Sequence, residues 1–280
     1  MIVPADFPLE TTDFLRRGGI NVRARPDPLF PQRAVKDADE LEAVRQAMVA
    51  TELALEEALL TLRHTHTTAD GTLKSEGVAL TSERLRQIVH GRLVHEGFGA
   101  RHTIVACGEQ GCDPHCEGSG PLRACEPIII DIFPQSDASG YFGDLTRTVV
   151  VGEPSAELCS LYNAVRGAQE LAISSICDGA DGGDIHRQVE DHFREKGYQT
   201  GEQNGRMQGF FHGTGHGLGL DIHEAPSIGA RRDTLRSGQV VTVEPGLYYA
   251  GIGGVRIEDV VVVTDDGCRN LTSAPKHLRL

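Results

Sequence analysis

The chain has 280 residues, of which 39% are hydrophobic and 24% charged, as is ordinary for a globular protein. Its formal net charge of -13 argues against a nucleic-acid partner, because phosphate binding needs a basic surface. The longest apolar runs, 128–130 and 260–263, are too short to cross a bilayer, so no membrane association is expected. The first residues do not resemble a secretory signal, and the seven cysteines show no disulfide-scaffold spacing. We therefore expect a cytoplasmic protein with free thiols.

Residues 1–35 are rich in proline, arginine and aspartate and show no sustained periodicity, so they predict an irregular lead-in with one short helix near Thr11–Arg17. The first long helix is predicted from Asp37, which forms a capping-box pattern with Glu40. Its apolar residues recur at spacings of three, four and seven: Leu41, Val44, Met48, Leu55, Leu59 and Leu62. A second helix is expected over 82–96 with Gly97 as its stop. Strands are expected at 103–106, 127–133 and 147–151.

The same plan then recurs in the second part of the chain. Pro154 and Ser155 open a helix with an apolar face, and Asp184 is expected to cap a further helix that stops at Gly197. Strands are expected at 240–243 and 255–263, separated by a glycine-rich turn. Each half is thus two helices followed by paired strands, which predicts an α+β fold with antiparallel strands covered by helices on one side.

Four carboxylates lie at corresponding points of these halves, on or beside apolar strands. They are Asp131, Asp144, Glu244 and Glu258. Asp131 and Glu244 are 113 positions apart, and Asp144 and Glu258 are 114 positions apart. The predicted helix starts at Asp37 and Ser155 are 118 positions apart. A pseudo-two-fold axis between the halves would bring all four acids together. The alternative is that each acid forms an ordinary ion pair at a strand end.

Four bare carboxylates cannot share a site, because like charges a few ångströms apart raise one another's pKa values. Divalent cations resolve that conflict. The segment Phe211–Glu224 adds three histidines and four glycines, and neutral imidazole is the commonest metal ligand. One histidine with four carboxylates suits manganese, iron, cobalt or zinc, and so many ligands fit two ions about 3.5 Å apart better than one. The chemistry indicated is metal-assisted hydrolysis; the alternative for this segment is a tight turn with solvent-facing histidines.

Together these residues resemble the creatinase-type metallopeptidases, the pita-bread family that contains methionine aminopeptidase, prolidase and Xaa-Pro aminopeptidase. The motifs are Asp131, Gly-Asp144-Leu-Thr-Arg-Thr, Gly-His216-Gly-Leu-Gly, Val-Glu244-Pro-Gly-Leu-Tyr and Val-Arg-Ile-Glu258-Asp. The resemblance implies a pita-bread fold, with two pseudo-symmetric ααββ halves and a curved, mainly antiparallel sheet covered by helices. It also implies two divalent ions, with manganese expected first and cobalt, zinc or iron as alternatives.

Carried over by the resemblance, Asp131 would chelate one ion, His216 and Glu244 the other, and Asp144 and Glu258 both. Glu244 would also carry the proton of the metal-bridging water, which leaves a bridging hydroxide. His115 and His223 match substrate-side histidines that steady the tetrahedral intermediate. Substrate-binding positions typical of the proline-handling members are matched by His212, Arg256 and Tyr248. Thr146 is expected to hold a carboxylate. These residues favour an Xaa-Pro aminopeptidase or prolidase acting on short peptides.

The resemblance departs from the family pattern in two places. Asp131 and Asp144 are thirteen positions apart where the family usually has eleven, and we expect the turn at 135–140 to absorb the two extra residues, since an even insertion preserves strand facing. Proline-specific relatives usually carry a separate N-terminal domain, whereas we expect only the lead-in at 1–35 before a catalytic domain at 36–280. That domain often contributes to dimerisation, so a homodimer is one assembly to test.

Three other interpretations are open at this point. A methionine aminopeptidase or general dipeptidase would share the fold, and a non-catalytic peptide-binding module could use the same scaffold. The four cysteines Cys107, Cys112, Cys116 and Cys125 could form a small metal site, although their spacing contains no Cys-x2-Cys pair. We expect them to be buried or incidental thiols. The remaining histidines, including His186 and His192, are expected at the surface of helices.

Overall fold

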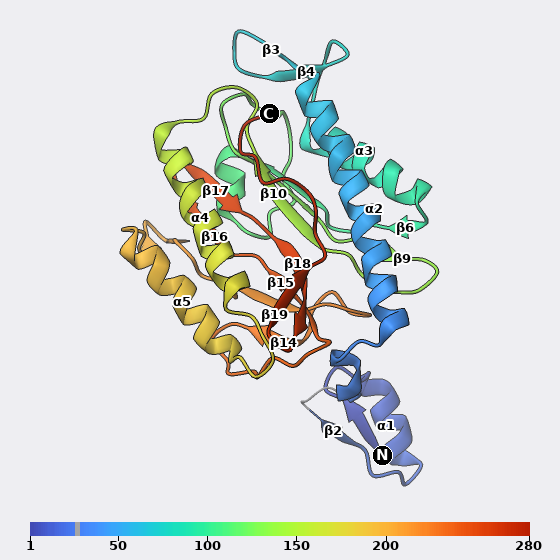
Figure 1. The fold of residues 1–280 in the computed structure, drawn as a ribbon. Coiled ribbons are helices and arrows are strands. Elements are labelled where there is room, and N and C mark those ends of the chain that lie inside the picture. Colours follow the sequence, from blue (N-terminus) through green and yellow to red (C-terminus); the bar gives the residue numbers. More distant parts are fainter. Residues whose placement is uncertain (26–28) are drawn as a thin grey trace.

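In the computed structural model, which describes residues 1–25 and 29–280, a small N-terminal segment projects from a two-part body (Figure 1). The segment contains a parallel strand pair, β1 (Ile2–Pro4) with β2 (Arg23–Arg25), joined by α1 (Leu9–Arg17), and it continues into the 3-10 helix η1 (Pro31–Ala34). The short helix is confirmed, two residues longer than expected. The expectation of an irregular lead-in was wrong for these residues, because three-residue strands are too short to show periodicity; its part at 26–28 lies outside the described residues.

The first half of the body is built from α2 (Ala38–Arg63), α3 (Ser82–His95) and a three-stranded antiparallel sheet. The sheet has the order β10 (Leu145–Val149), β8 (Ile128–Ile132), β7 (Ile104–Cys107). The predicted capping box of Asp37 and Glu40 is present, and Gly97 ends α3 with a φ of 82°. The connections contain η2 (Gly108–Cys112) and the short strands β3 (His66–Thr67), β4 (Leu73–Ser75), β5 (Val78–Ala79), β6 (Phe98–Gly99) and β9 (Gln135–Ser136).

The second half repeats this plan with α4 (Ala156–Ser174), α5 (Gly182–Glu195) and a larger sheet. Its order is β14 (Glu224–Ile228), β13 (Gly215–Gly217), β15 (Val240–Val243), β18 (Asp259–Thr264), β19 (Gly267–Asn270). Two further hairpins are β11 (Gly201–Gln203) with β12 (Arg206–Gln208) and β16 (Gly246–Tyr249) with β17 (Gly253–Arg256).

Two details of the second half differ from the sequence prediction. The cap of α5 is Asp181, whose carboxylate accepts hydrogen bonds from the backbone N–H groups of Gly183 and Asp184, so the helix begins earlier than expected. The two glycines that follow Asp181 made the start of α5 hard to predict from the sequence, because glycine is a poor helix former. The stretch after Glu244 is also a strand, β16, and not simply a turn.

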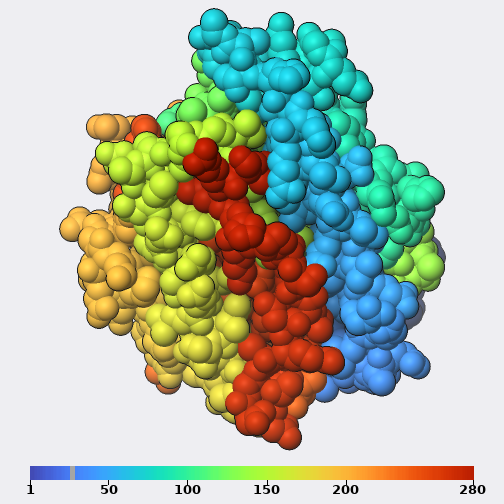
Figure 2. Space-filling model, turned by 45° about the horizontal axis from the view of Figure 1, so that its top comes forward, coloured from blue at the N-terminus to red at the C-terminus, as the bar shows by residue number. Residues whose placement is uncertain are grey.

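Helices cover one side of the sheets, and the apolar face of each helix fills a core. The face of α2 packs with α3, β8 and β10, whereas α4 packs with α5, β15, β16, β17 and β19, and α5 packs with β14. Residues 271–280 run between α2 and α4, seen as the red strip in Figure 2. There the backbone N–H of Leu280 donates to the carbonyl of Val150 at 3.0 Å. None of the helices in the described part of the chain is both long and apolar enough to cross a membrane.

The caps that open α2 and α4 provide a test of this architecture. Asp37 accepts from the N–H of Glu40 at 2.9 Å, and Ser155 accepts from the N–H of Leu158 at 3.1 Å. Asp37→Ala and Ser155→Ala should each lower the free energy of unfolding by about 1 kcal/mol, because a backbone donor loses its partner. Urea titration measures this. Glu56→Ala, at an exposed position within α2, is the control and should change stability by less than about 0.5 kcal/mol.

Candidate metal centre

The first two acids share one face of the antiparallel pair β8–β10. Asp131 is opposite Thr146 in the register, and Asp144 precedes Thr146 by two residues, so all three side chains point to the same side. The turn between the strands closes through hydrogen bonds from Gly140 to Ser136 and from Gly143 to Pro134. This turn absorbs the longer spacing of the two aspartates without changing the direction in which either points.

The other two acids lie where strands of the second half end and begin. Val243 is opposite Asp259 in the β15–β18 pair, so Glu244 leaves one strand beside the point at which Glu258 enters the other. The backbone N–H of Glu258 donates to the carbonyl of Thr146, which joins this end of the sheet to the first half. The carboxylate of Glu258 accepts a hydrogen bond from the Thr146 hydroxyl at 2.7 Å, the kind of contact expected for Thr146.

These acids converge on His216. One ligand atom each from Asp144, His216 and Glu258 lie within 4.8 Å of one another. The Nε2 atom of His216 is 3.7 Å from Asp144 Oδ2 and 3.5 Å from Glu244 Oε1. Asp131 Oδ1 is buried and has no hydrogen-bond partner within the described part of the chain, although such an atom normally has one. The donor set therefore matches a site for cations.

Burial and mutual repulsion disfavour the charged forms of these carboxyls. Burial, reinforced by the neighbouring acids, raises the pKa of Asp144 and of Glu258 well above the usual values. Burial also raises the pKa of Glu244 to about 8, against the opposing effect of the Arg256 charge. The pKa of His216 is lowered to about 3, first by burial and then by His223. A neutral imidazole beside several acids is what a cation requires of its ligands.

Glycines make room for His216 on the short strand β13, which lies between β14 and β15. A Cβ added at Gly217 would lie 2.5 Å from the carbonyl oxygen of Ala225, and one added at Gly215 would collide with the carbonyl oxygen of Thr242. The backbone N–H of His216 donates to the hydroxyl of Thr242 at 3.1 Å. The glycines of this stretch thus allow strands to approach closely around the histidine.

A series of polar side chains, linked by hydrogen bonds, lies beside the acids. Arg256 Nη2 is 2.6 Å from Asp131 Oδ2, and its Nη1 donates to the hydroxyl of Tyr248 at 2.9 Å. The same hydroxyl is 2.8 Å from Nε2 of His212. Burial, followed by the charge of Arg256, lowers the pKa of His212 to about 3. Tyr248 is fully buried, so it can act on a substrate only through His212 and Arg256.

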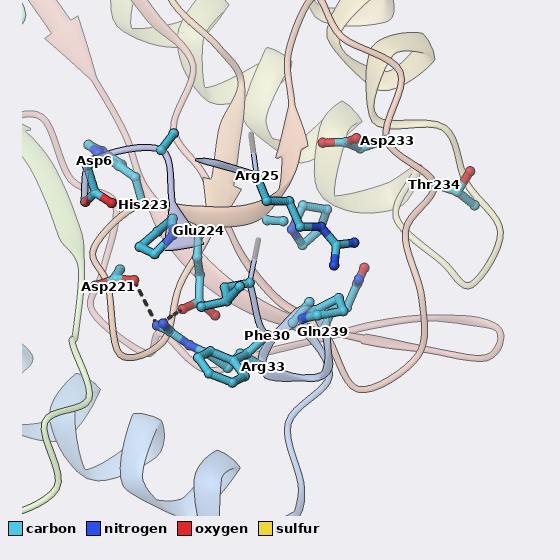
Figure 3. Close-up of a pocket in the computed structure, with 17 residues that line it drawn as sticks. Asp6, Arg25, Phe30, Arg33, Asp221, His223, Glu224, Asp233, Thr234 and Gln239 are labelled. Carbon is cyan, nitrogen blue, oxygen red and sulfur yellow. Dashed lines mark hydrogen bonds and ion pairs between the residues drawn. The ribbon is translucent and has the colours of Figure 1, made fainter. Parts of the chain in front are cut away.

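His223 and His115 are both exposed. The ring of His223 lies edge-on to that of His216, with centroids 4.3 Å apart. Partial burial of the ring lowers the pKa of His223, and the charge of His115 lowers it further. His223 also lines a pocket of about 830 Å³ between the N-terminal segment and the body. Arg25 and Phe30 of that segment line the same pocket (Figure 3).

The sequence analysis missed or misjudged several residues around this centre. His186 is buried and not at the surface, with Nδ1 2.9 Å from the hydroxyl of Thr214. The apolar positions on either side of it along α5, Ile185 and Val189, were a signal that this face points inward. The buried arginine Arg147, which pairs with Asp259 at 2.9 Å, was also not recognised. No local signal marks that pair, because its partners are far apart in the chain.

The cysteines do not assemble a second centre. In the portions of the chain that the structure describes, the only group of three potential ligands is the one at His216. Cys107 is buried and Cys125 is exposed, while Cys112 and Cys116 lie between these extremes. All seven are free, as expected.

The pseudo-symmetric halves, the helices over mainly antiparallel sheets and the acids at the seam define the pita-bread fold of metallopeptidases. A family model described as metallopeptidase family M24 matches residues 42–265, and the chain therefore belongs to that family. The Xaa-Pro dipeptidase from Bacillus anthracis has a TM-score of 0.84 and 30% identity, with 100% of this chain and 74% of that one covered. The X-Pro aminopeptidase from Thermotoga maritima has a TM-score of 0.81 and 30% identity, with 98% and 73% covered.

Sequence relatives agree with this assignment. The uncharacterized peptidase YqhT of Bacillus subtilis is 41% identical over 176 residues, which are 62% of this chain and 47% of that protein. The Xaa-Pro dipeptidase of Pyrococcus furiosus is 32% identical over 178 residues, which are 63% of this chain and 48% of that protein. The chain thus matches about half the length of these two relatives.

The raised pKa of Glu244 makes the stability of the metal-free protein depend on pH. Above about pH 7 an unfolded glutamate is ionised, whereas Glu244 in the folded protein keeps its proton up to about pH 8. Between pH 7 and 8 the folded protein therefore binds more protons than the unfolded chain, so stability should fall as pH rises. For a group that stays protonated only when folded, the slope is about 1.4 kcal/mol per pH unit.

Thermal unfolding of chelator-treated protein across this range measures the effect. In Glu244→Gln the slope should become smaller, with the contributions of Asp144 and Glu258 remaining because their pKa values are also raised. An equally steep decline in the variant would show that Glu244 does not titrate in this window.

Proposed function

We propose that the chain is a dinuclear metal-dependent exopeptidase that hydrolyses the N-terminal peptide bond of short peptides, with proline as the second residue. The observation that carries the proposal is the convergence of Asp144, Glu244 and Glu258 on His216, with Asp131 on the same face of the first sheet. Family membership and the names of similar proteins, an X-Pro aminopeptidase and two Xaa-Pro dipeptidases, support the same activity.

The chain's own residues fit two divalent ions. Within the described residues Asp131 has a buried oxygen without a hydrogen-bond partner, and the neighbouring acids, once ionised, would carry more negative charge than Arg256 alone can balance. Asp131 would hold one ion, His216 and Glu244 the other, and Asp144 and Glu258 both. Manganese is our first choice for so oxygen-rich a set, with cobalt, zinc or iron as alternatives. When bound, the ions would acidify a water and polarise the scissile carbonyl.

Proton transfer is assigned to Glu244. A carboxylate beside the ions would accept a proton from the attacking water and return it to the departing amine. His223 and His115 would donate hydrogen bonds to the oxygen that becomes negative in the transition state. The pocket bordered by His223 is wide enough for a short peptide to approach from that side.

Recognition of proline is assigned to the chain His212–Tyr248–Arg256. Arg256 is occupied by Asp131 and Tyr248 is buried, so His212 is the member that can contact the substrate directly. Tyr248 would hold His212 through the 2.8 Å contact and keep its ring in one orientation. A ring fixed against a buried hydroxyl suits a rigid substrate, because neither partner loses much freedom on binding.

The proposal predicts hydrolysis of Xaa-Pro dipeptides and tripeptides that depends on added manganese and stops with a chelator. Released amino acid is measured by chromatography, and Met-Ala is compared with Met-Pro to separate a proline-specific enzyme from a methionine aminopeptidase or general dipeptidase. Metal content is determined on the same sample. Folded protein that binds two ions yet cleaves no peptide would instead indicate a binding module on this scaffold, and the proposed activity would be wrong.

Two variants separate the metal site from the substrate side. Asp144→Ala should abolish activity and bound metal together, because it removes a carboxylate assigned to both ions. His223→Ala should lower kcat by about 100-fold, within the range of one acid–base group, and leave close to two ions per chain. Activity assays with elemental analysis decide between these outcomes. Metal loss in His223→Ala would contradict its substrate-side role.

A further inference from the structure

Arg33 and Lys36, which lie shortly before α2, form ion pairs with the loop that carries His223. We call residues 219–224 the histidine strap. Arg33 Nη2 is 2.9 Å from Asp221 Oδ2 and 2.9 Å from Glu224 Oε2, both drawn as dashed lines in Figure 3. Lys36 Nζ is 2.5 Å from Glu224 Oε1. Both oxygens of Glu224 are thus bound by cations that lie far away in the sequence.

Burial separates this contact from ordinary surface ion pairs. The Lys36 side chain is 1% exposed and that of Glu224 is 11% exposed. Lys36 also donates to the backbone carbonyl of Arg33 at 2.8 Å, so its ammonium has partners on both sides. An ion pair shielded from water loses little to salt screening, and its charge-assisted hydrogen bonds fix the geometry of both partners.

The strap has little freedom where Glu224 folds back over it. A Cβ added at Gly219 would lie 2.5 Å from Glu224 Oε1, so the carboxylate rests directly on the glycine backbone. The carbonyl of Gly219 accepts from the N–H of Phe142 at 2.9 Å. The N-terminal side is fixed as well, since the backbone N–H of Lys36 donates to the carbonyl of Gly238, two residues before β15.

His223 itself lacks such support. Among the described residues its ring has no hydrogen-bond partner, and it lies edge-on to the ring of His216. The position of His223 over the metal centre therefore depends on the backbone of the strap, and the next residue in that backbone is Glu224.

We propose that Lys36 and Arg33 act through Glu224 as positioning residues that hold His223 in place over the metal centre. The inference deepens the proposed function, on which it rests. It makes Arg33 of the N-terminal segment, and Lys36 just after that segment, part of the catalytic apparatus. A displacement of about 1 Å in a group that contacts the reacting atoms is enough to cost about 100-fold in rate.

The test compares Glu224→Gln and Lys36→Met with the matched control Glu42→Gln, which breaks an exposed ion pair with Arg45 on α2. Glu224→Gln and Lys36→Met should lower kcat for an Xaa-Pro dipeptide by about 10- to 100-fold with two ions still bound. The control should keep wild-type kcat. Lys36→Arg should recover most of the activity, because the cation is restored.

A second readout needs neither metal nor substrate. Amide hydrogen exchange of the metal-free protein, followed by mass spectrometry, should become faster in the peptide that contains residues 219–224 and stay unchanged in α4. Modification of His223 by diethyl pyrocarbonate should also become faster. If Glu224→Gln does not fold, Arg33→Gln removes only the half-exposed contact and should shift both measurements in the same direction.

The outcomes separate this inference from the proposed function. Wild-type protein without peptidase activity would overturn the function, and the exchange measurement would still decide whether the strap depends on Glu224. Wild-type kcat or unchanged strap exchange in folded Glu224→Gln would overturn the positioning role. Loss of bound metal in that variant would also overturn it, since the strap would then support the ligands and not His223.

Discussion

Four carboxylates meet at the seam between the two sheets: Asp131, Asp144, Glu244 and Glu258. The other side chains that face inward from these sheets are mostly apolar, and much of the structure accommodates this crowding of like charge. Removing a carboxylate from water without a partner costs several kcal/mol, and each neighbouring anion adds to that cost. Arg256 neutralises only part of the charge, through its contact with Asp131. The remaining negative charge is removed when carboxyls stay protonated or, as we propose, is balanced by bound cations.

The two halves must approach closely for the acids to converge, and glycines permit this. A Cβ at Gly254 on β17 would collide with the carbonyl of Gly111 in η2, so the halves touch backbone to backbone there. On the opposite side of the acids, Arg147 extends from β10 to Asp259 at the start of β18. Its other N–H groups donate to backbone carbonyls, among them that of Ala274 at 2.7 Å. The seam is thus closed by backbone contact at Gly254 and by hydrogen bonds from all three guanidinium nitrogens of Arg147.

Features with a local cause could be predicted from the sequence. The caps at Asp37 and Ser155 follow from residue type, and the acids could be paired between halves because the spacings agree. Features that depend on distant contacts could not. Nothing near Glu224 in the sequence indicates Lys36, which is 188 positions away, and nothing near Arg147 indicates Asp259, which is 112 positions away. The strand β16 was missed because Pro245 and Gly246 look like turn residues, although the pairing with β17 satisfies their backbone.

The contacts that assemble the site also span unusual distances along the chain. Thr146 and Glu258 are 112 residues apart, and Arg256 and Asp131 are 125 apart. Each half can bury most of its core before these contacts form, because its helices and strands follow one another in sequence. Closing so long a loop is entropically costly, and repulsion between the acids opposes the final approach. We therefore expect docking of the two halves to limit the rate of folding. Cations bound as we propose would lower the repulsion between the acids and so make docking faster.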